Sequence, residues 1–337
     1  MRKENKNNFN SIPKKLAILA GKGGVGKSTI TALLAKGMLK KNYKVGVLDA
    51  DLYGPSMRHL FPDELLPQAE GEKVRPAMSG GIAVMSSAYF PENQGVTVVR
   101  APIANQVVTQ FVEEVDWGEL DLLLVDFPPG TGDIQISLLQ KIAFDAALIL
   151  TLPHELSAID VRKSVLMCEQ MGVPLLGILE NMSYLSDPQT GKPLTVFGEG
   201  GGANLAKEFH LPFLGKIPIE PSLNCQEGLS SIPTSFSSAF QKVFEGLKKE
   251  KTCIINHEDR YHFSIEWLDG KKSFYRFSVL QKHCPCALCQ EGKGSQDVKD
   301  VEGNKVVLVG RYGIQVAFSS GCSKGIYPFS LLREFDR

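Results

Sequence analysis

The segment that most limits what this chain can fold into is a glycine-rich stretch between a short apolar run and a helical pattern. Residues 15–20 read KLAILA, residues 21–28 read GKGGVGKS, and residues 28–40 place apolar side chains at helical spacing. Glycines allow a backbone to wrap around an anion, while N–H groups at the start of the helix face it. A Gly-Lys-Ser ending in this strand-to-helix context predicts a phosphate-binding P-loop.

Short apolar runs recur along the first two thirds of the chain, with helical stretches between them. Runs this short and continuously apolar are typical of strands buried on both faces of a parallel sheet. Their alternation with helices predicts an α/β fold with a doubly wound, mostly parallel sheet. The runs span residues 15–20, 44–50, 122–127, 146–153, 174–182 and 212–218. Two further runs, 81–88 and 97–102, are candidates for additional strands.

The character of the sequence changes near residue 248. The segment FEGLKKEKTCIINHEDR is charged and has no clear period, which indicates a linker. Beyond it, HFSIEWLDGKKSFYRFSVL is rich in aromatic and β-branched residues around an Asp-Gly turn, which predicts a hairpin. The predicted organisation is a flexible N-terminal tail over 1–13, a P-loop NTPase domain over 14–248, a linker over 249–257 and a small β-rich metal-binding domain over 258–337.

Charge and composition narrow the classes of partner. The chain has 337 residues, with 37 basic and 37 acidic side chains and a formal net charge of zero. A neutral chain has no bulk electrostatic attraction for nucleic acid or for an anionic membrane, so neither partner is expected. No apolar run approaches the roughly 18–20 residues that span a bilayer, and the polar leader is not a secretory signal. We therefore expect a cytoplasmic protein whose seven cysteines are thiols or metal ligands.

The P-loop supplies the first candidate site residues. Lys27 is expected to reach the β- and γ-phosphates of a nucleotide, and the Ser28 hydroxyl to ligate Mg²⁺. The backbone of the whole loop is expected to contact the nucleotide. The predicted nucleotide-binding residues of this segment are Gly21, Lys22, Gly23, Gly24, Val25, Gly26, Lys27, Ser28 and Thr29.

Carboxylates follow two of the other predicted strands. The second run ends in DADLYGPS, with Asp49 and Asp51, and the third ends in DFPPGTGD, with Asp126. Ligands bind at the carboxyl edge of such sheets. Four apolar residues followed by Asp126 form a Walker B pattern, which predicts that Asp126 holds Mg²⁺ through water. Gly130 is expected to approach the γ-phosphate with its backbone N–H, so that the loop senses the nucleotide.

Taken together, these motifs resemble the Mrp/ApbC family of iron–sulfur cluster carriers. GKGGVGKST, VGVLDADLYGPS, DFPPGTGD, GILENMSY, FGEGGG and LGKIPIEP occur in that family's order and spacing over roughly residues 14–228. The resemblance implies a slow ATPase that binds ATP and Mg²⁺, forms a homodimer and transfers a 4Fe–4S cluster to apo-proteins or scaffold proteins. It also implies that Asp51 orients the attacking water and that Asn181 reads the adenine edge.

Lys22 carries a second, wider resemblance. A lysine near the start of the loop, as in KGGVGKS, is similar to the deviant Walker A signature of MinD/ParA-like ATPases. That resemblance implies that Lys22 crosses a face-to-face dimer and stabilises charge on the partner's nucleotide. The expected catalytic residues are therefore Lys22, Lys27, Asp51 and Asp126.

The segment after ENMSY departs from the carrier family. Family members have a CxxC pair there, and two such pairs hold one cluster across the dimer. Here Asp187 and Thr190 stand at those positions, and neither is a good ligand for a soft metal. Two alternatives to a cluster carrier therefore remain open: a partition-type switch like MinD/ParA proteins, and a zinc-stapled regulatory ATPase without cluster transfer.

The C-terminal segment holds a compact group of cysteines. Cys284, Cys286 and Cys289 fall in HCPCALC, and Cys322 follows a strand-like run in a Ser-Gly turn. Four sulfurs suit either a closed zinc site or a 4Fe–4S cluster, and both remain possible. IEWLDG, HCPCALC and SGCSKGIYPFSLLREF resemble the N-terminal domain of γ-butyrobetaine hydroxylase-like enzymes. No role is assigned to Cys225 or Cys253.

Overall fold

The chain divides into two compact units, Met1–Lys248 and Lys249–Arg337. The computed structural model describes residues 8–62, 64–90, 101–187, 189–190, 192–209, 211–220, 233–248, 253–267, 271–292, 301–309 and 313–335. Each unit has its own core and is described separately. Within the described residues, no helix has both the length and the apolar character needed to cross a membrane.

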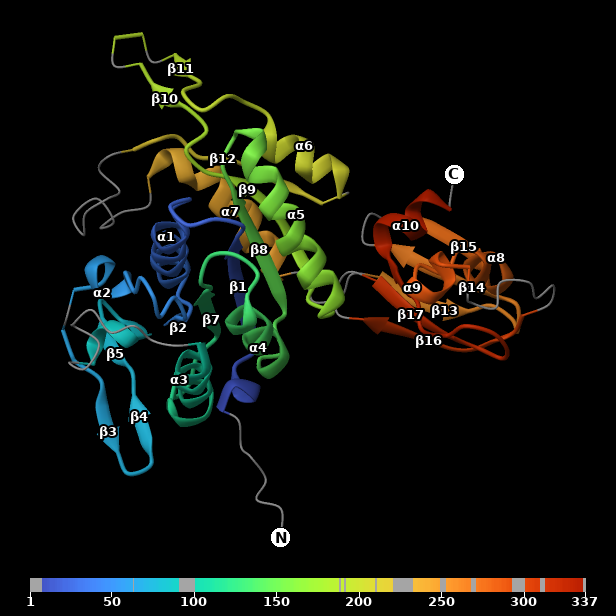
Figure 1. The fold of residues 1–337 in the computed structure, drawn as a ribbon, viewed down its shortest axis with the longest axis horizontal. Coiled ribbons are helices and arrows are strands. Elements are labelled where there is room, and N and C mark those ends of the chain that lie inside the picture. The colour runs from blue at the N-terminus through green and yellow to red at the C-terminus, as the bar shows by residue number, and fades with distance from the viewer. Residues whose placement is uncertain are drawn as a thin grey trace. The chain divides into compact units, whose positions relative to one another are not determined.

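The first unit is built on an eight-stranded sheet in the order β12-β9-β8-β1-β7-β2-β6-β5 (Figure 1). All neighbours pair in parallel except β5, which runs antiparallel to β6. Central strands are buried along their whole length because helices cover both faces. The strands are β1 (Lys14–Ala20), β2 (Val45–Asp49), β5 (Ala77–Ser79), β6 (Ile82–Ser86), β7 (Leu122–Asp126), β8 (Ala146–Thr151), β9 (Leu175–Glu180) and β12 (Phe213–Lys216).

Two hydrophobic clusters lie on the two faces of this sheet. One contains side chains of α1 (Lys27–Lys40) and α7 (Thr234–Lys248). The other contains side chains of four helices, α3 (Ala101–Glu114), α4 (Asp133–Lys141), α5 (Glu155–Gln170) and α6 (Gly201–Glu208). The sheet therefore has a complete apolar layer on each side, and its carboxyl edge is fixed by packing that does not depend on a ligand.

Shorter elements surround the sheet. They are the 3₁₀ turns η1 (Asn8–Ser11) and η2 (Ser87–Tyr89), the helix α2 (Met57–Leu60), and the hairpins β3 (Gln68–Glu70)–β4 (Lys73–Arg75) and β10 (Leu185–Ser186)–β11 (Pro193–Leu194). In Figure 1, β10 and β11 extend away from the sheet. Phe9 and Ile12 are buried, and the Phe9 ring packs edge-on against Trp117. Residues 8–12 thus differ from the flexible tail expected over 1–13, because two apolar side chains anchor them in the core.

The second unit contains two three-stranded antiparallel sheets around one hydrophobic cluster. Residues 253–257, expected in a linker, form its first strand, β13, paired with β14 from Cys253–Trp267 to His257–Phe263. The strands are β13 (Cys253–His257), β14 (His262–Trp267), β15 (Lys272–Arg276), β16 (Gly303–Val309), β17 (Gly313–Phe318) and β18 (Ile326–Pro328). The helices are α8 (Phe277–Lys282), α9 (Ala287–Gln290) and α10 (Phe329–Glu334).

The predicted fold class is confirmed: a mostly parallel α/β sheet is followed by a small β-rich region. All six apolar runs contain strands of the large sheet, and the run 81–88 contains β6. The other candidate strand, 97–102, lies largely outside the described residues, and its last two residues begin α3. A strand there is therefore wrong for residues 101–102.

Candidate nucleotide site and candidate metal centre

The glycine-rich loop turns tightly between β1 and α1. Gly24 and Gly26 have φ angles of +77° and +82°, a left-handed conformation that residues with a Cβ rarely adopt. Gly26 caps α1, which begins at Lys27, so the first N–H groups of the helix are directed into the loop. This is the backbone geometry that anion binding at a helix N-terminus requires.

Lys27, Ser28 and Asp126 meet at the carboxyl edge of the sheet. The Ser28 hydroxyl donates to the Asp126 carboxylate at 2.5 Å, and the Lys27 ammonium lies 3.7 Å from it. Asp126 is fully buried, and burial raises its pKa, an effect that the Lys27 charge and the Ser28 hydrogen bond oppose. The arrangement holds a cation, a hydroxyl and a carboxylate at the start of the helix, which is the chemistry that a Mg·nucleotide needs.

Asp49 and Asp51 organise the loop after β2 in different ways. Asp49 is fully buried and accepts the backbone N–H groups of Ser56 and Met57 at 3.2 Å and the Ser86 hydroxyl at 2.9 Å. Burial and the neighbouring Asp126 raise the pKa of Asp49 to about 7. Asp51 is half-buried, lines the cleft and accepts the Gly54 N–H at 3.3 Å. Asp49 therefore shapes the loop that carries Asp51.

A cleft of about 470 Å³ opens over the loop. Most of the predicted nucleotide residues line it, together with residues that follow β2, β9 and β12. Its lining residues are Lys22, Gly23, Gly24, Val25, Gly26, Lys27, Ser28, Thr29, Ile30, Asp51, Gly54, Ser56, Asn181, Met182, Pro218, Ile219 and Glu220. The structure thus brings Lys22, Lys27, Asp51 and Asn181 to one cleft.

Three predicted residues make contacts within the chain. The Asn181 side-chain N–H donates to the Val25 carbonyl at 2.8 Å, which ties the end of β9 to the loop. The Gly130 N–H, expected to face a phosphate, donates to the Ala20 carbonyl at 3.4 Å. The Lys22 ammonium lies 3.5 Å from the Asp160 carboxylate of α5. These contacts describe the chain alone, and the predicted nucleotide contacts of all three remain predictions.

The tip of the β10–β11 hairpin occupies the position where the resembled family has its CxxC pair. The Asp187 carboxylate accepts the backbone N–H groups of Gln189 and Thr190, each at 2.8 Å. The Thr190 hydroxyl accepts the N–H of Lys192 at 3.3 Å. Both side chains therefore cap a turn, and hard oxygens engaged in this way are poor substitutes for two thiolates.

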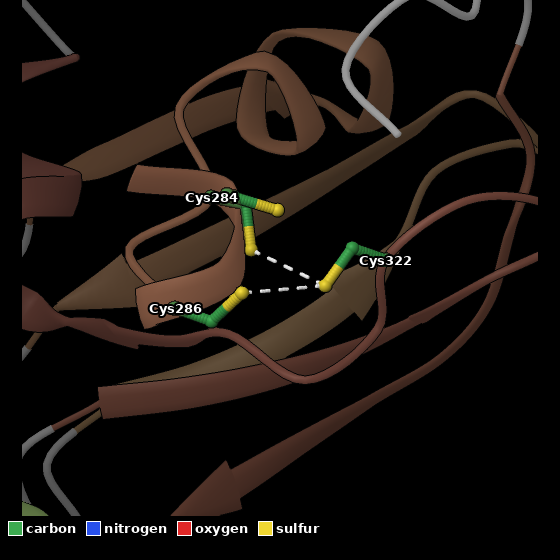
Figure 2. Close-up of side chains that lie close together, drawn as sticks. Cys284, Cys286 and Cys322 are labelled. Atoms are coloured by element: carbon green, nitrogen blue, oxygen red, sulfur yellow. Dashed lines mark hydrogen bonds between the residues drawn. The ribbon is translucent and has the colours of Figure 1, made fainter. Parts of the chain in front are cut away.

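The four predicted cysteines of the second unit converge. Their sulfur atoms all lie within 4.8 Å of one another. Figure 2 shows the Cys322 sulfur facing those of Cys284 and Cys286, at 3.8 Å and 3.4 Å. Within the described part of the chain, this is the one group of three or more His, Cys, Asp or Glu side chains able to share a metal ion. His283 lies outside it, with its ring tilted at 50° against the ring of Phe335.

The environment of the cysteine group differs from one sulfur to the next. Cys284 and Cys289 are buried, and burial raises the pKa of both thiols. At Cys286, burial is outweighed by hydrogen bonds from the Cys289 N–H and the neighbouring thiols, which lower the pKa to about 7. A Cβ on Gly325 would lie 2.6 Å from the Cys284 sulfur, so the backbone closes tightly over the group.

Sequence reasoning missed several supporting residues. Gln135 is buried and donates its side-chain amide to the carbonyls of Pro128 and Pro129, at 3.1 and 2.7 Å. Glu180 is fully buried and accepts the Gly202 N–H at 2.7 Å, while its other oxygen has no partner among the described residues. The Thr31 hydroxyl donates to the Lys27 carbonyl at 2.9 Å and lies 3.4 Å from the Asp126 carboxylate, and its position one helical turn after Lys27 is the signal that could have identified it.

Two family models match the chain, one over each of its two units. The family described as NUBPL iron-transfer P-loop NTPase, a ParA group, matches residues 11–250. The family described as γ-butyrobetaine hydroxylase-like, N-terminal, matches residues 254–333. An iron–sulfur cluster carrier protein of Methanococcus maripaludis is 40% identical, over 73% of this chain and 89% of its own. One of Methanocaldococcus jannaschii is 43% identical, over 63% of this chain and 75% of its own.

Two solved structures are similar to about 70% of the chain. A nucleotide-binding protein from Archaeoglobus fulgidus, in complex with ADP, is 36% identical with a TM-score of 0.61, over 70% of this chain and 96% of its own. A variant of McdA from Cyanothece, in complex with ATP, has a TM-score of 0.51 at 18% identity, over 69% of this chain and 96% of its own. This second likeness shows similarity of fold alone.

Proposed function

This chain belongs to the NUBPL iron-transfer P-loop NTPase family, and from that premise we propose that it is a slow, dimeric ATPase that delivers iron–sulfur clusters to apo-proteins. The observation that supports the ATPase part is the meeting of Lys27 and Ser28, which line the cleft, with the buried carboxylate of Asp126. The delivery part rests on the relatives named iron–sulfur cluster carrier proteins.

The nucleotide chemistry follows from the chain's own groups. Lys27, already beside a buried carboxylate, meets the β- and γ-phosphates, and the loop N–H groups surround them. Ser28 and Asp126 offer the hard oxygen ligands that Mg²⁺ prefers, directly and through water. A bound Mg²⁺ supplies charge stabilisation to the phosphates. Asp51, held at the cleft by the loop that Asp49 shapes, orients the attacking water.

The dimer completes the site in this proposal. Lys22 reaches the nucleotide of the partner subunit and stabilises charge that develops during phosphoryl transfer, much as an arginine finger does. An added cation of this kind raises the rate by about 10³–10⁵-fold. Hydrolysis then depends on dimer formation, and dimer formation depends on ATP.

A second candidate function is favoured by the hairpin tip. Asp187 and Thr190 satisfy the backbone of the β10–β11 turn, so no pair of thiols is available there to carry a cluster between subunits. In this alternative the chain is a nucleotide-dependent regulatory switch that hydrolyses ATP but does not transfer iron–sulfur clusters. A partition-type role is a variant of the same alternative.

We further propose that the four-cysteine group holds a single zinc ion. Tetrahedral zinc with Zn–S bonds of about 2.3 Å places its sulfurs about 3.8 Å apart. In the structure, sulfur–sulfur separations of 3.8 and 3.4 Å, within a group no wider than 4.8 Å, fit such an ion after small adjustments. A 4Fe–4S cluster, the other possibility, places irons and sulfides between its cysteines and separates them further.

Metal analysis of the full chain after anaerobic purification tests these proposals. If the chain is a cluster carrier, iron and sulfide are found in equal amounts and are transferred to an apo-protein when Mg·ATP is added. If the chain is the regulatory switch, it holds zinc alone. After reconstitution with iron and sulfide it still holds only zinc, and it hydrolyses ATP. Iron and sulfide without zinc, lost on Cys286→Ser, would contradict the zinc assignment.

A further inference from the structure

Lys22 and Asp160 form an ion pair that neither the family match nor the site chemistry explains. The Lys22 ammonium lies 3.5 Å from one oxygen of the Asp160 carboxylate, on the second turn of α5. Lys22 is about half exposed and also lines the nucleotide cleft. The side chain proposed to act on a partner subunit is thus held, in the single chain, by a carboxylate of its own subunit.

The backbone fixes this pairing. Gly21 has no Cβ, and a Cβ there would lie 2.5 Å from the Asp160 carbonyl carbon and 2.7 Å from the Val161 nitrogen. The first residue of the loop is therefore packed directly against α5 at Asp160. Because the two backbones touch at this point, Lys22 leaves the loop within reach of the carboxylate. The ion pair does not depend on two long side chains meeting by chance.

The carboxylate is also arranged to remain charged. Its second oxygen lies 3.1 Å from the ammonium of Lys163, one helical turn later. The Lys163 hydrogen bond, with a smaller contribution from Lys22, holds the pKa of Asp160 below its usual range. Each oxygen of Asp160 thus has one lysine partner, and Lys163 keeps the carboxylate in place when Lys22 leaves.

We infer that Asp160 is a positioning residue that retains Lys22 on its own subunit until a partner's nucleotide competes for it. This rests on the proposed role of Lys22 in a dimer. A nucleoside triphosphate carries more negative charge than one carboxylate. A desolvated interface strengthens the attraction between this charge and the Lys22 ammonium. An exposed ion pair is weak enough to be exchanged, so Asp160 sets the ATP-dependent threshold for dimerisation without preventing it.

The first test asks whether the pair exists in solution. Full-length, nucleotide-free protein is treated with an amine-acylating reagent, and the modification rate of each lysine is measured by mass spectrometry. An ammonium that shares a carboxylate reacts more slowly, so Asp160→Asn should raise the Lys22 rate about two- to fivefold, the range that an exposed ion pair gives. Glu208→Gln, which removes the α6 carboxylate paired with Arg162 of α5, should leave that rate unchanged. Equal Lys22 rates in the wild type and Asp160→Asn would overturn the inference.

The second test asks whether the pair controls dimer formation. Dimerisation is measured by light scattering over a range of protein concentrations, with Mg²⁺ and a non-hydrolysable ATP analogue. Asp160→Asn should lower the dimer Kd about two- to fivefold, with no change in nucleotide affinity at concentrations where the chain is monomeric. The difference from wild type should shrink at high salt, because exposed charges are screened. An unchanged or weaker dimer in Asp160→Asn would contradict the retention of Lys22.

Lys22→Ala separates this inference from the proposed function. If Lys22→Ala dimerises like the wild type, the role of Lys22 in a dimer is wrong. If Lys22→Ala fails to dimerise while Asp160→Asn behaves like the wild type, the dimer role stands and only the retention by Asp160 is wrong.

Discussion

The two units place their polar groups differently with respect to the core. In the first unit, Lys27, Ser28 and Asp126 lie at the edge of a sheet whose two faces are covered by separate hydrophobic clusters. In the second, Cys284 and Cys289 are themselves members of the single hydrophobic cluster. The first site is supported by a core that it does not belong to, whereas the second site is part of the core that supports it.

This difference implies different responses to loss of a ligand. The first unit keeps its loop geometry through left-handed glycines, the Asn181–Val25 hydrogen bond and strand packing. The second unit, Lys249–Arg337, has about 90 residues, close to the size at which a small core often needs a bound metal or another cross-link. We therefore expect the nucleotide unit to fold without nucleotide and the cysteine-rich unit to depend on its metal.

Metal removal has the largest expected effect. Zinc contributes about 10–16 kcal/mol of apparent binding free energy in small zinc domains, so chelation or Cys286→Ser should unfold the second unit of the full chain. The chain has two tryptophans, Trp117 in the first unit and Trp267 in the second. In a Trp117→Phe background, the emission of Trp267 should shift to longer wavelength on chelation.

The control for this prediction is Cys168→Ala, which removes a buried thiol from the first unit. It should leave zinc content and Trp267 emission unchanged. If the second unit stays folded and resists proteolysis after complete metal removal, then the expected difference between the two units in their dependence on a ligand is wrong.

Lys27→Ala comes next in size. Without the cation that meets the β- and γ-phosphates, ATP turnover should fall by more than about 10³-fold, and productive nucleotide binding should be lost. Lys40→Ala, at the exposed end of the same helix, is the matched control and should keep full activity. Circular dichroism should show both variants folded. ATP turnover unchanged in Lys27→Ala would rule out the assignment of this loop.

Asp51→Asn should separate binding from hydrolysis. The amide oxygen can still accept the Gly54 N–H, so the loop keeps its shape, but the group that orients water is neutral. We expect a fall of about 10²–10⁴-fold in kcat with nucleotide affinity within a few-fold of wild type. Rapid single-turnover measurements beside equilibrium binding check this. A proportional loss of binding and turnover would point instead to a structural role for Asp51.

Two surface ion pairs, one in each unit, give the smallest expected effects. Arg162 and Glu208 join α5 to α6 at 2.6 Å, and Lys272 and Glu258 lie 3.0 Å apart in the second unit. Both pairs lie at the surface with partly exposed side chains, so Arg162→Ala and Lys272→Ala should each change the free energy of unfolding by about 0–1 kcal/mol. Denaturation of the metal-loaded chain measures both. A loss of several kcal/mol from either would show that its unit depends on surface charge more than on its core or metal.

Local sequence was sufficient to predict a large part of the fold and of the candidate sites. Seven of the eight strands of the central sheet lie in predicted apolar runs, and only β5 was missed. These strands, the P-loop and the spacing of Cys284, Cys286 and Cys289 are each encoded within a few neighbouring residues, where hydrophobic period, glycine content and ligand spacing act directly. The order of motifs was sufficient for the family, which the match over residues 11–250 confirms. The short segments 8–12 and 253–257 differ from expectation because polar and charged neighbours in the sequence conceal their buried or paired positions.

The tertiary structure decided the contacts between distant segments. The pairing of Lys22 with Asp160, the hydrogen bond from Asn181 to Val25 and the approach of Cys322 to Cys286 join residues separated by 138, 156 and 36 positions. Asp49 became a loop-shaping residue because strand order placed β6, with Ser86, beside β2. Such contacts follow from which strands are neighbours and in what register they pair, and no local pattern in the sequence carries that information.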